Sequence, residues 1–115
     1  MNSKEIFSLA LNLEKPWYIK EIIFEKPELN KFGRLTIQID FERGAKFTIE
    51  GGEECSVYDT KIMRWQHLNF FENECYIEAR VPRVKDKNNK VHTIQVPWAR
   101  SGSGFTLLFE AYSML

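Results

Sequence analysis

The strongest constraint on the fold of this 115-residue chain is a run of alternating apolar and polar residues. Leu35, Ile37, Ile39 and Phe41 lie two positions apart, with polar residues between them. Side chains alternate between the two faces of an extended strand, so this period of two predicts a strand with one buried face. Similar runs predict a sheet of about six strands, the others being at 17–25, 46–50, 62–71, 75–84 and 91–98.

Turn-forming residues between the predicted strands indicate hairpins. Asn88 and Asn89 separate the strand that ends at Val84 from the strand that begins at Val91. Asparagine tolerates the positive φ that tight hairpin turns require, so this pair predicts a hairpin. The fold class that we expect is therefore α+β, mainly β, with an antiparallel sheet.

Two helices are expected to flank the sheet. Residues 3–13 carry apolar side chains at helical spacing, with Ser3 as the predicted N-cap and Pro16 just beyond the end. The second predicted helix is apolar on nearly every side, which calls for burial or a partner. We expect three parts: a β-rich domain at 1–98, a linker at 99–104 and a C-terminal helix at 105–115, packed on the domain or on a partner.

The charges are balanced overall but unevenly distributed. Lys and Arg number 16, as do Asp and Glu, giving a formal net charge of zero. Residues 60–100 hold eight basic and four acidic side chains, a net charge of +4, whereas residues 1–59 hold eight and eleven, a net charge of −3. A basic sheet face with nearby tryptophans is typical of nucleic-acid binding. The alternative is a solvated strand face whose cations pair with neighbouring glutamates.

Targeting and metal-binding patterns are not found in the sequence. It has no membrane-length apolar run and no signal-peptide pattern, so we expect a cytoplasmic protein with no membrane partner. Cys55 and Cys75 are then expected to be free thiols. With His67 and His92 they are the soft metal ligands of the chain, and they form no Cys-x-x-Cys pair. We expect no metal and no cofactor, although the sequence does not fix whether these four side chains converge.

Three motifs, in this order, resemble the N-terminal region of ISL3-family bacterial transposases. They are Arg-Trp-Gln-His-Leu at 64–68, Arg-Val-Pro-Arg-Val at 80–84 and Val-Pro-Trp-Ala-Arg at 96–100. The resemblance covers nearly the whole chain. It implies a zinc-binding domain that helps to recognise the terminal repeats of a mobile element, followed in the family by helix-turn-helix segments and a catalytic domain.

The chain departs from that family pattern at the zinc ligands. Thr48 and Gly51 stand where the resemblance places the first cysteine pair, and Asp86 and Asn89 stand at the second pair. These side chains would make a poor tetrahedral zinc site. We therefore expect degenerate zinc-ribbon-like hairpins that are held by turn chemistry and the aromatic core.

The resemblance leads to an expected function. The chain ends at Leu115, inside what the family continues as a helix, so we expect a truncated, non-catalytic transposase-like protein with weak DNA binding, and not an enzyme. The alternative is a protein-interaction module that self-associates or binds an intact transposase through its last helix, using Phe105, Leu108, Phe109 and Tyr112. The candidate DNA contacts are Lys61, Arg64, Trp65, His67, Arg80, Arg83, Lys85 and Arg100, with Trp65 and His67 either reading bases or packing.

Overall fold

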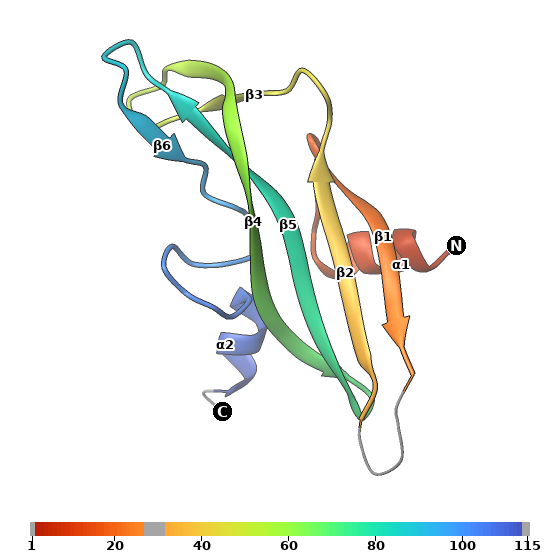
Figure 1. The fold of residues 1–115 in the computed structure, drawn as a ribbon. Coiled ribbons are helices and arrows are strands. Elements are labelled where there is room, and N and C mark those ends of the chain that lie inside the picture. The colour runs from red at the N-terminus through yellow and green to blue at the C-terminus, as the bar shows by residue number, and fades with distance from the viewer. Residues whose placement is uncertain (1, 27–31, 114–115) are drawn as a thin grey trace.

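The protein is described by a computed structural model, which covers residues 2–26 and 32–113. Helices and strands follow one another as α1 (Ser3–Ala10), β1 (Trp17–Glu25), β2 (Arg34–Phe41), β3 (Lys46–Thr48), β4 (Glu54–Phe70), β5 (Asn73–Lys85), β6 (Val91–Thr93) and α2 (Leu107–Ser113). The expectation of a mainly β, α+β fold with six strands and two short helices is confirmed (Figure 1). Within the described ranges, no helix is long and apolar enough to cross a bilayer.

The strands form one sheet in the order β1-β2-β5-β4-β3, and β6 pairs with the free end of β5. Most neighbours are antiparallel, but β2 and β5 are parallel, with Ile37 opposite Ile77. This parallel pair departs from the purely antiparallel sheet that the hairpin signals predict. It arises because the 17-residue β4 runs back along the sheet, so that β5 returns in the direction of β2.

Element ends also differ from the predicted ones for identifiable reasons. The N-cap of α1 is Asn2, not Ser3: the Asn2 Oδ1 accepts the Glu5 N–H at 2.8 Å, and the Glu5 carboxylate accepts the Asn2 N–H at 3.3 Å. The second helix begins at Leu107, since the Thr106 hydroxyl oxygen accepts the Phe109 N–H at 3.2 Å. The predicted 91–98 strand is paired only over Val91–Thr93.

The two faces of the sheet have different surroundings. Ile37, Ile77 and the residues alternating with them lie on one face, which we call the covered face. Residues 94–106, which we call the connector, contribute Val96, Trp98 and Ala99 to the core on this face, and the apolar residues of and just after α1 pack against it. The opposite face, which we call the open face, carries the polar residues of β2, β4 and β5.

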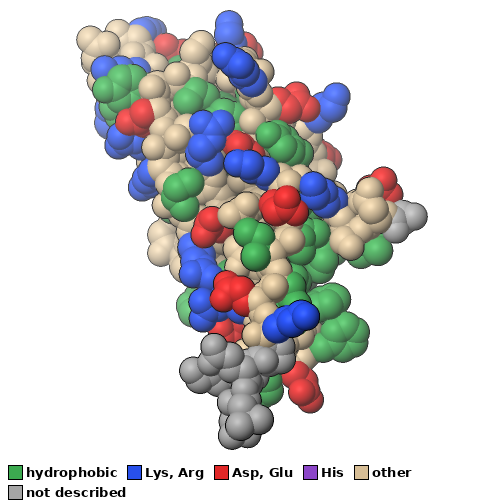
Figure 2. All heavy atoms as spheres, turned by 45° about the vertical axis from the view of Figure 1, so that its right-hand side comes forward, with side chains coloured by type: hydrophobic (Ala, Val, Ile, Leu, Met, Phe, Trp, Pro, Cys, Tyr) green, Lys and Arg blue, Asp and Glu red, His purple; other side chains and the backbone are tan. Residues whose placement is uncertain are grey.

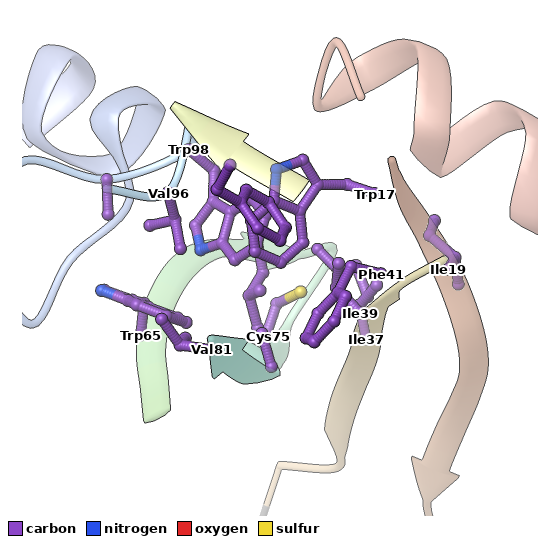
Figure 3. Close-up of a cluster of buried hydrophobic side chains, with 14 of the residues drawn as sticks. Trp17, Ile19, Ile37, Ile39, Phe41, Trp65, Cys75, Val81, Val96 and Trp98 are labelled. Atoms are coloured by element: carbon purple, nitrogen blue, oxygen red, sulfur yellow. The ribbon is translucent and has the colours of Figure 1, made fainter. Parts of the chain in front are cut away.

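An aromatic cluster joins the connector to the sheet (Figure 3). Trp98 packs edge-to-face on Trp17, with ring centroids 5.1 Å apart, and on Trp65 at 5.4 Å. Phe41 and Phe47 extend the cluster beyond Trp17, at 5.9 and 5.8 Å. Aromatic side chains bury large areas and prefer such tilted contacts, so this cluster is a main source of stability.

A matched pair of isoleucines tests the assignment of faces. Ile77 is fully buried on the covered face of β5, whereas Ile62 of β4 is 66% exposed on the open face. Ile77→Ala should lower the free energy of unfolding by about 2 to 5 kcal/mol, because it leaves a cavity. Ile62→Ala should change it by less than about 0.5 kcal/mol. Urea unfolding of both variants measures the difference, and equal losses would contradict the assignment.

Candidate nucleic-acid interface

The eight candidate DNA-contacting side chains do not form one surface. The register places Lys61 opposite Val81 and Arg64 opposite Glu78 on the β4–β5 hairpin. Because side chains alternate, Lys61 lies with Trp65 on the covered face, and Arg64 lies on the open face. Four candidates, Lys61, Arg83, Lys85 and Arg100, lie on the covered side, Arg64 and Arg80 lie on the open face, and Trp65 and His67 are buried.

Trp65 and His67 are part of the core. Their exposed fractions are 3% and 9%, so neither ring reaches a ligand at the surface. Trp65 and His67 therefore do not belong among the surface contacts. Of their two predicted roles, base reading and packing, the structure shows packing. His67 Nδ1 lies 2.6 Å from the Thr106 hydroxyl oxygen, which links β4 to the start of α2. Burial lowers the pKa of His67, because the charged ring loses hydration.

Cations and anions alternate on the open face. Arg80 Nε donates to Asp40 at 3.1 Å, and its guanidinium lies 4.6 Å from the Phe41 ring centroid. Arg64 stacks on Tyr76 at 4.1 Å. Figure 2 shows a face of the molecule on which basic and acidic side chains are interleaved, with no patch of a single sign. This pattern matches the solvated strand face that was the alternative to DNA binding.

Pairing continues on the open face at β2. Arg34 forms a salt bridge with Glu74 at 3.4 Å, and Gln38 donates to Glu78 at 3.2 Å. Such exposed pairs contribute little to stability, about 0 to 1 kcal/mol each. Their larger effect is on the potential of this face, which they keep near neutral.

The upper part of the covered side is more basic. Lys61, Arg83 and Lys85 lie there beside Asp59, which accepts two hydrogen bonds from the Arg83 guanidinium. These hydrogen bonds lower the pKa of Asp59. Lys85 Nζ lies 4.0 Å from the centroid of the exposed Tyr58 ring, and Tyr58 is not among the predicted contacts. Tyr58 occupies the irregular position between Val57 and Asp59, and such a bulge has no sequence signal.

A hollow lies between the sheet and the connector. Met63, Trp65 and Val81 line it on the sheet, and residues 100–104 of the connector line it on the other side. Arg100 donates to Glu110 of α2 at 2.6 and 3.1 Å. These hydrogen bonds raise the pKa of Arg100 and lower that of Glu110. Arg100 thus holds α2 against the connector while its 67% exposed side chain remains at the rim.

The four soft metal ligands do not converge. His67 and Cys75 are cross-strand partners, but Cys55 lies beside β3 and His92 bonds Asp86 through Nε2 at 2.8 Å. Burial raises the pKa of Cys75 to about 11, so its thiol stays protonated. Across residues 2–26 and 32–113, no three His, Cys, Asp or Glu side chains are grouped to hold an ion.

The predicted interaction residues surround the start of α2. Phe105 and Phe109 stack with ring centroids 4.7 Å apart. Phe105, Leu108 and Tyr112 are 42%, 40% and 58% exposed. The apolar character predicted for this segment is therefore present at the surface, on the side of α2 that the sheet does not cover.

The fold is a mainly antiparallel sheet, and the basic side of its β4–β5 hairpin is a candidate binding surface. The sequence is similar to two curated proteins, both named "Transposase for insertion sequence element IS1557", from Mycobacterium tuberculosis strains CDC 1551 / Oshkosh and H37Rv. Each is 28% identical over 114 residues, which cover 96% of this chain and 26% of the relative. No family model and no solved structure matches the chain. The chain is thus transposase-like and spans about a quarter of these relatives.

The comparison corrects one expectation. The prediction that the protein is not an enzyme is wrong in this light, because the relatives are named transposases, which are enzymes. The prediction relied on the last residue of the chain, Leu115, and the position of a last residue carries no information about activity. The similarity to transposases confirms the coarser part of the predicted function.

The lowered pKa of His67 predicts a pH dependence of stability. The ordinary pKa of histidine is about 6.5, so the unfolded chain takes up a proton before the folded chain does as pH falls. Stability should therefore fall as pH drops below about 6.5. Urea midpoints at pH 7.5 and 5.5 should differ less for His67→Gln than for wild type, and the open-face variant Ile62→Ala, which removes no titratable group, serves as control. An unchanged difference in His67→Gln would contradict the assignment.

Proposed function

We propose that this 115-residue chain is the DNA-binding part of a transposase-like protein. In this proposal it contacts the ends of the mobile element. The observation that carries the proposal is the placement of Lys61, Arg83 and Lys85 on one side of the β4–β5 hairpin, with Arg100 at the rim of the hollow beside it. The similarity to named transposases supports it, because such enzymes act on DNA. The open face is close to neutral, so in this proposal the basic side is the one that faces the DNA.

The two lysines are the main phosphate contacts in this proposal. Within the part of the chain that the structure describes, neither Lys61 nor Lys85 has a salt-bridge partner, so each retains its full charge for a phosphate. Arg83 and Arg100 are held by Asp59 and Glu110 and add less. A phosphate contact releases a condensed counterion from DNA, so binding of this kind is weak and strongly dependent on salt.

We also propose that the two hairpins next to this surface are held without zinc. Asp86 supports the role of turn chemistry: its Oδ1 accepts the N–H groups of Asn88 at 2.8 Å and Lys90 at 3.0 Å. Asn89 has a φ of 63°, as expected for a hairpin asparagine. The Lys87 N–H donates to Glu53 Oε1 at 3.1 Å and joins the two hairpins.

The metal-free proposal predicts that a chelator has no effect on stability. Purified protein should contain no stoichiometric zinc by elemental analysis, and its melting temperature should be the same with and without a strong zinc chelator. Asp86→Ala should lower the melting temperature, since it removes the acceptor of both turn N–H groups, whereas Asp86→Asn, which keeps one acceptor oxygen, should lower it less. One zinc per chain would overturn the proposal.

A second candidate function is protein interaction through α2. The observation that favours it is the exposure of Phe105, Leu108 and Tyr112 on one short segment, since exposed apolar clusters mark interaction sites. Its partner would be a second copy of the chain or an intact transposase. If α2 mediates self-association, Leu108→Ser should weaken that association in a sedimentation experiment, and variants at the edge of β1 should not.

The DNA proposal predicts a specific change in salt dependence. Fluorescence anisotropy with a labelled duplex carrying the terminal repeat should show binding that weakens steeply with salt. The double variant Lys61→Gln/Lys85→Gln should bind more weakly, and the slope of log affinity against log salt should fall by about two, since each phosphate contact contributes about 0.9.

Arg64→Gln provides the matched control for that experiment. It also removes one exposed cation from β4, but from the open face, and should leave both affinity and slope nearly unchanged. A scrambled duplex measures how much of the binding depends on sequence. Undetectable binding at low salt, or equal losses in the Arg64 and lysine variants, would contradict the proposed surface.

A further inference from the structure

β1 is the outermost strand on one side of the sheet, and its outer edge has no strand beside it among the described residues. Backbone N–H and C=O groups of such an edge are free to pair with another strand. The edge is also apolar: Ile23 and Phe24 are 40% and 49% exposed, and Leu9 of the adjacent α1 is 68% exposed. Figure 1 shows α1 crossing behind β1, with the start of the helix beyond the edge of the sheet.

The direction in which the backbone groups of β1 point follows from two hydrogen bonds. The Ile22 N–H donates to its neighbouring Glu21 carboxylate at 3.2 Å, so it points away from β2. The Pro16 carbonyl accepts the Glu42 N–H at 2.9 Å, so it points toward β2. Backbone groups alternate along a strand, and β1 has an extra residue between Ile19 and Glu21. The outward-facing residues are therefore Trp17, Ile19, Ile22 and Phe24.

This set of outward residues is self-complementary. If a second copy of β1 lies antiparallel about a two-fold axis between Lys20 and Glu21, every residue of 17–24 meets a partner on the same face. The pairs are Trp17 with Phe24, Tyr18 with Ile23, Ile19 with Ile22 and Lys20 with Glu21. The first and third pairs join residues whose backbone groups both point outward, as a hydrogen-bonded pair requires.

The charges select this register over its neighbours. In it, Lys20 of each copy faces Glu21 of the other, and both side chains are exposed in the single chain. A shift by one position in either direction places Lys20 opposite Lys20, or Glu21 opposite Glu21. Like charges directly opposite each other destabilise a strand pair, and unlike charges stabilise it. The charged residues Lys20 and Glu21 at the bulge disfavour pairing with an arbitrary strand. The edge therefore favours a partner strand that places a glutamate opposite Lys20 and a lysine opposite Glu21.

Apolar side chains fill the space beside the paired strands. Residues of α1 and β1, among them Ser8, Leu9, Tyr18 and Ile19, line an open groove along the edge. In the two-fold arrangement Ile22 and Phe24 of the second copy lie opposite Ile19 and Trp17, on the face that α1 covers. They therefore reach this groove and cover Leu9.

We propose that the chain forms a two-fold symmetric dimer through antiparallel pairing of its β1 edges. The occupant of the edge is a second copy, because one strand supplies both halves of the charge pair and both halves of the apolar pairs. The two sheets then continue into one another. This interface differs from the α2 surface and does not depend on DNA binding.

A charge-swap series tests the dimer. Sedimentation of the 115-residue protein over a range of concentrations should show a monomer–dimer equilibrium. Lys20→Glu places two glutamates opposite each other at both positions, and Glu21→Lys places two lysines there, so each single variant should weaken association about tenfold or more. The double variant Lys20→Glu/Glu21→Lys restores both pairs and should recover wild-type association. Circular dichroism should confirm that all variants keep the fold.

Hydrogen exchange and an α2 variant complete the test. The amides of Ile19 and Phe24 should exchange more slowly in wild type than in either single variant at equal protein concentration. Leu108→Ser should leave the equilibrium unchanged. A wild-type protein that stays monomeric at the highest concentration, a double variant as weak as the single ones, or a dimer that only Leu108→Ser dissolves would each overturn the proposal.

Discussion

The packing of Trp98 between Trp17 and Trp65 is the contact on which the rest of the structure depends. The connector has no regular structure of its own over most of its length, and this ring attaches it to the covered face. The attachment sets one wall of the hollow, places Arg100 at its rim and positions Thr106 to cap α2. It leaves the buried Trp98 Nε1 without a hydrogen-bond partner among the described residues, a cost of about 1 to 3 kcal/mol that the aromatic contacts must exceed.

Register decides which of the charges can act on a ligand. Arg64 and Trp65 are neighbours in sequence, but β4 directs them to opposite faces. On the open face, the cations stand beside acidic residues of the adjoining strands, so their fields largely cancel beyond the surface. On the covered side, Lys61 lies opposite Val81, Lys85 lies over the Tyr58 ring, and the carboxylate of nearby Asp59 is bonded to Arg83. The excess of positive charge in residues 60–100 is therefore effective on one side only.

Local sequence patterns predicted the strands whose alternation is clear, and they failed where pairing between distant segments decides the outcome. β2 has the expected bounds at Arg34–Phe41 because its apolar and polar residues alternate without interruption. The first half of β4, from Glu54, was missed: its residues are mostly polar, and it is a strand because β3 and β5 pair with it. The parallel β2–β5 pair likewise has no local signal.

The candidate site was predictable to a similar degree. Alternation alone separates Arg64 from Trp65, so the sequence could have divided the eight candidates between two faces. It could not have shown that Arg83 pairs with Asp59 and Arg100 with Glu110, because those contacts depend on strand register and on the path of the connector. The bulge after Ile19, on which the edge pairing of β1 depends, is also visible only in the structure.

The two proposals support each other through geometry. In the sheet order, β1 lies at one side and β4 near the other, so pairing of the β1 edges leaves the basic side of β4–β5 uncovered in both copies. A two-fold axis through the β1 edges relates those two basic sides. A single chain with few uncompensated lysines binds DNA weakly, but two such surfaces on one rigid sheet raise the effective concentration for the second contact. The neutral overall charge of the chain is therefore compatible with useful DNA affinity, because association doubles the number of phosphate contacts without adding charge to either copy.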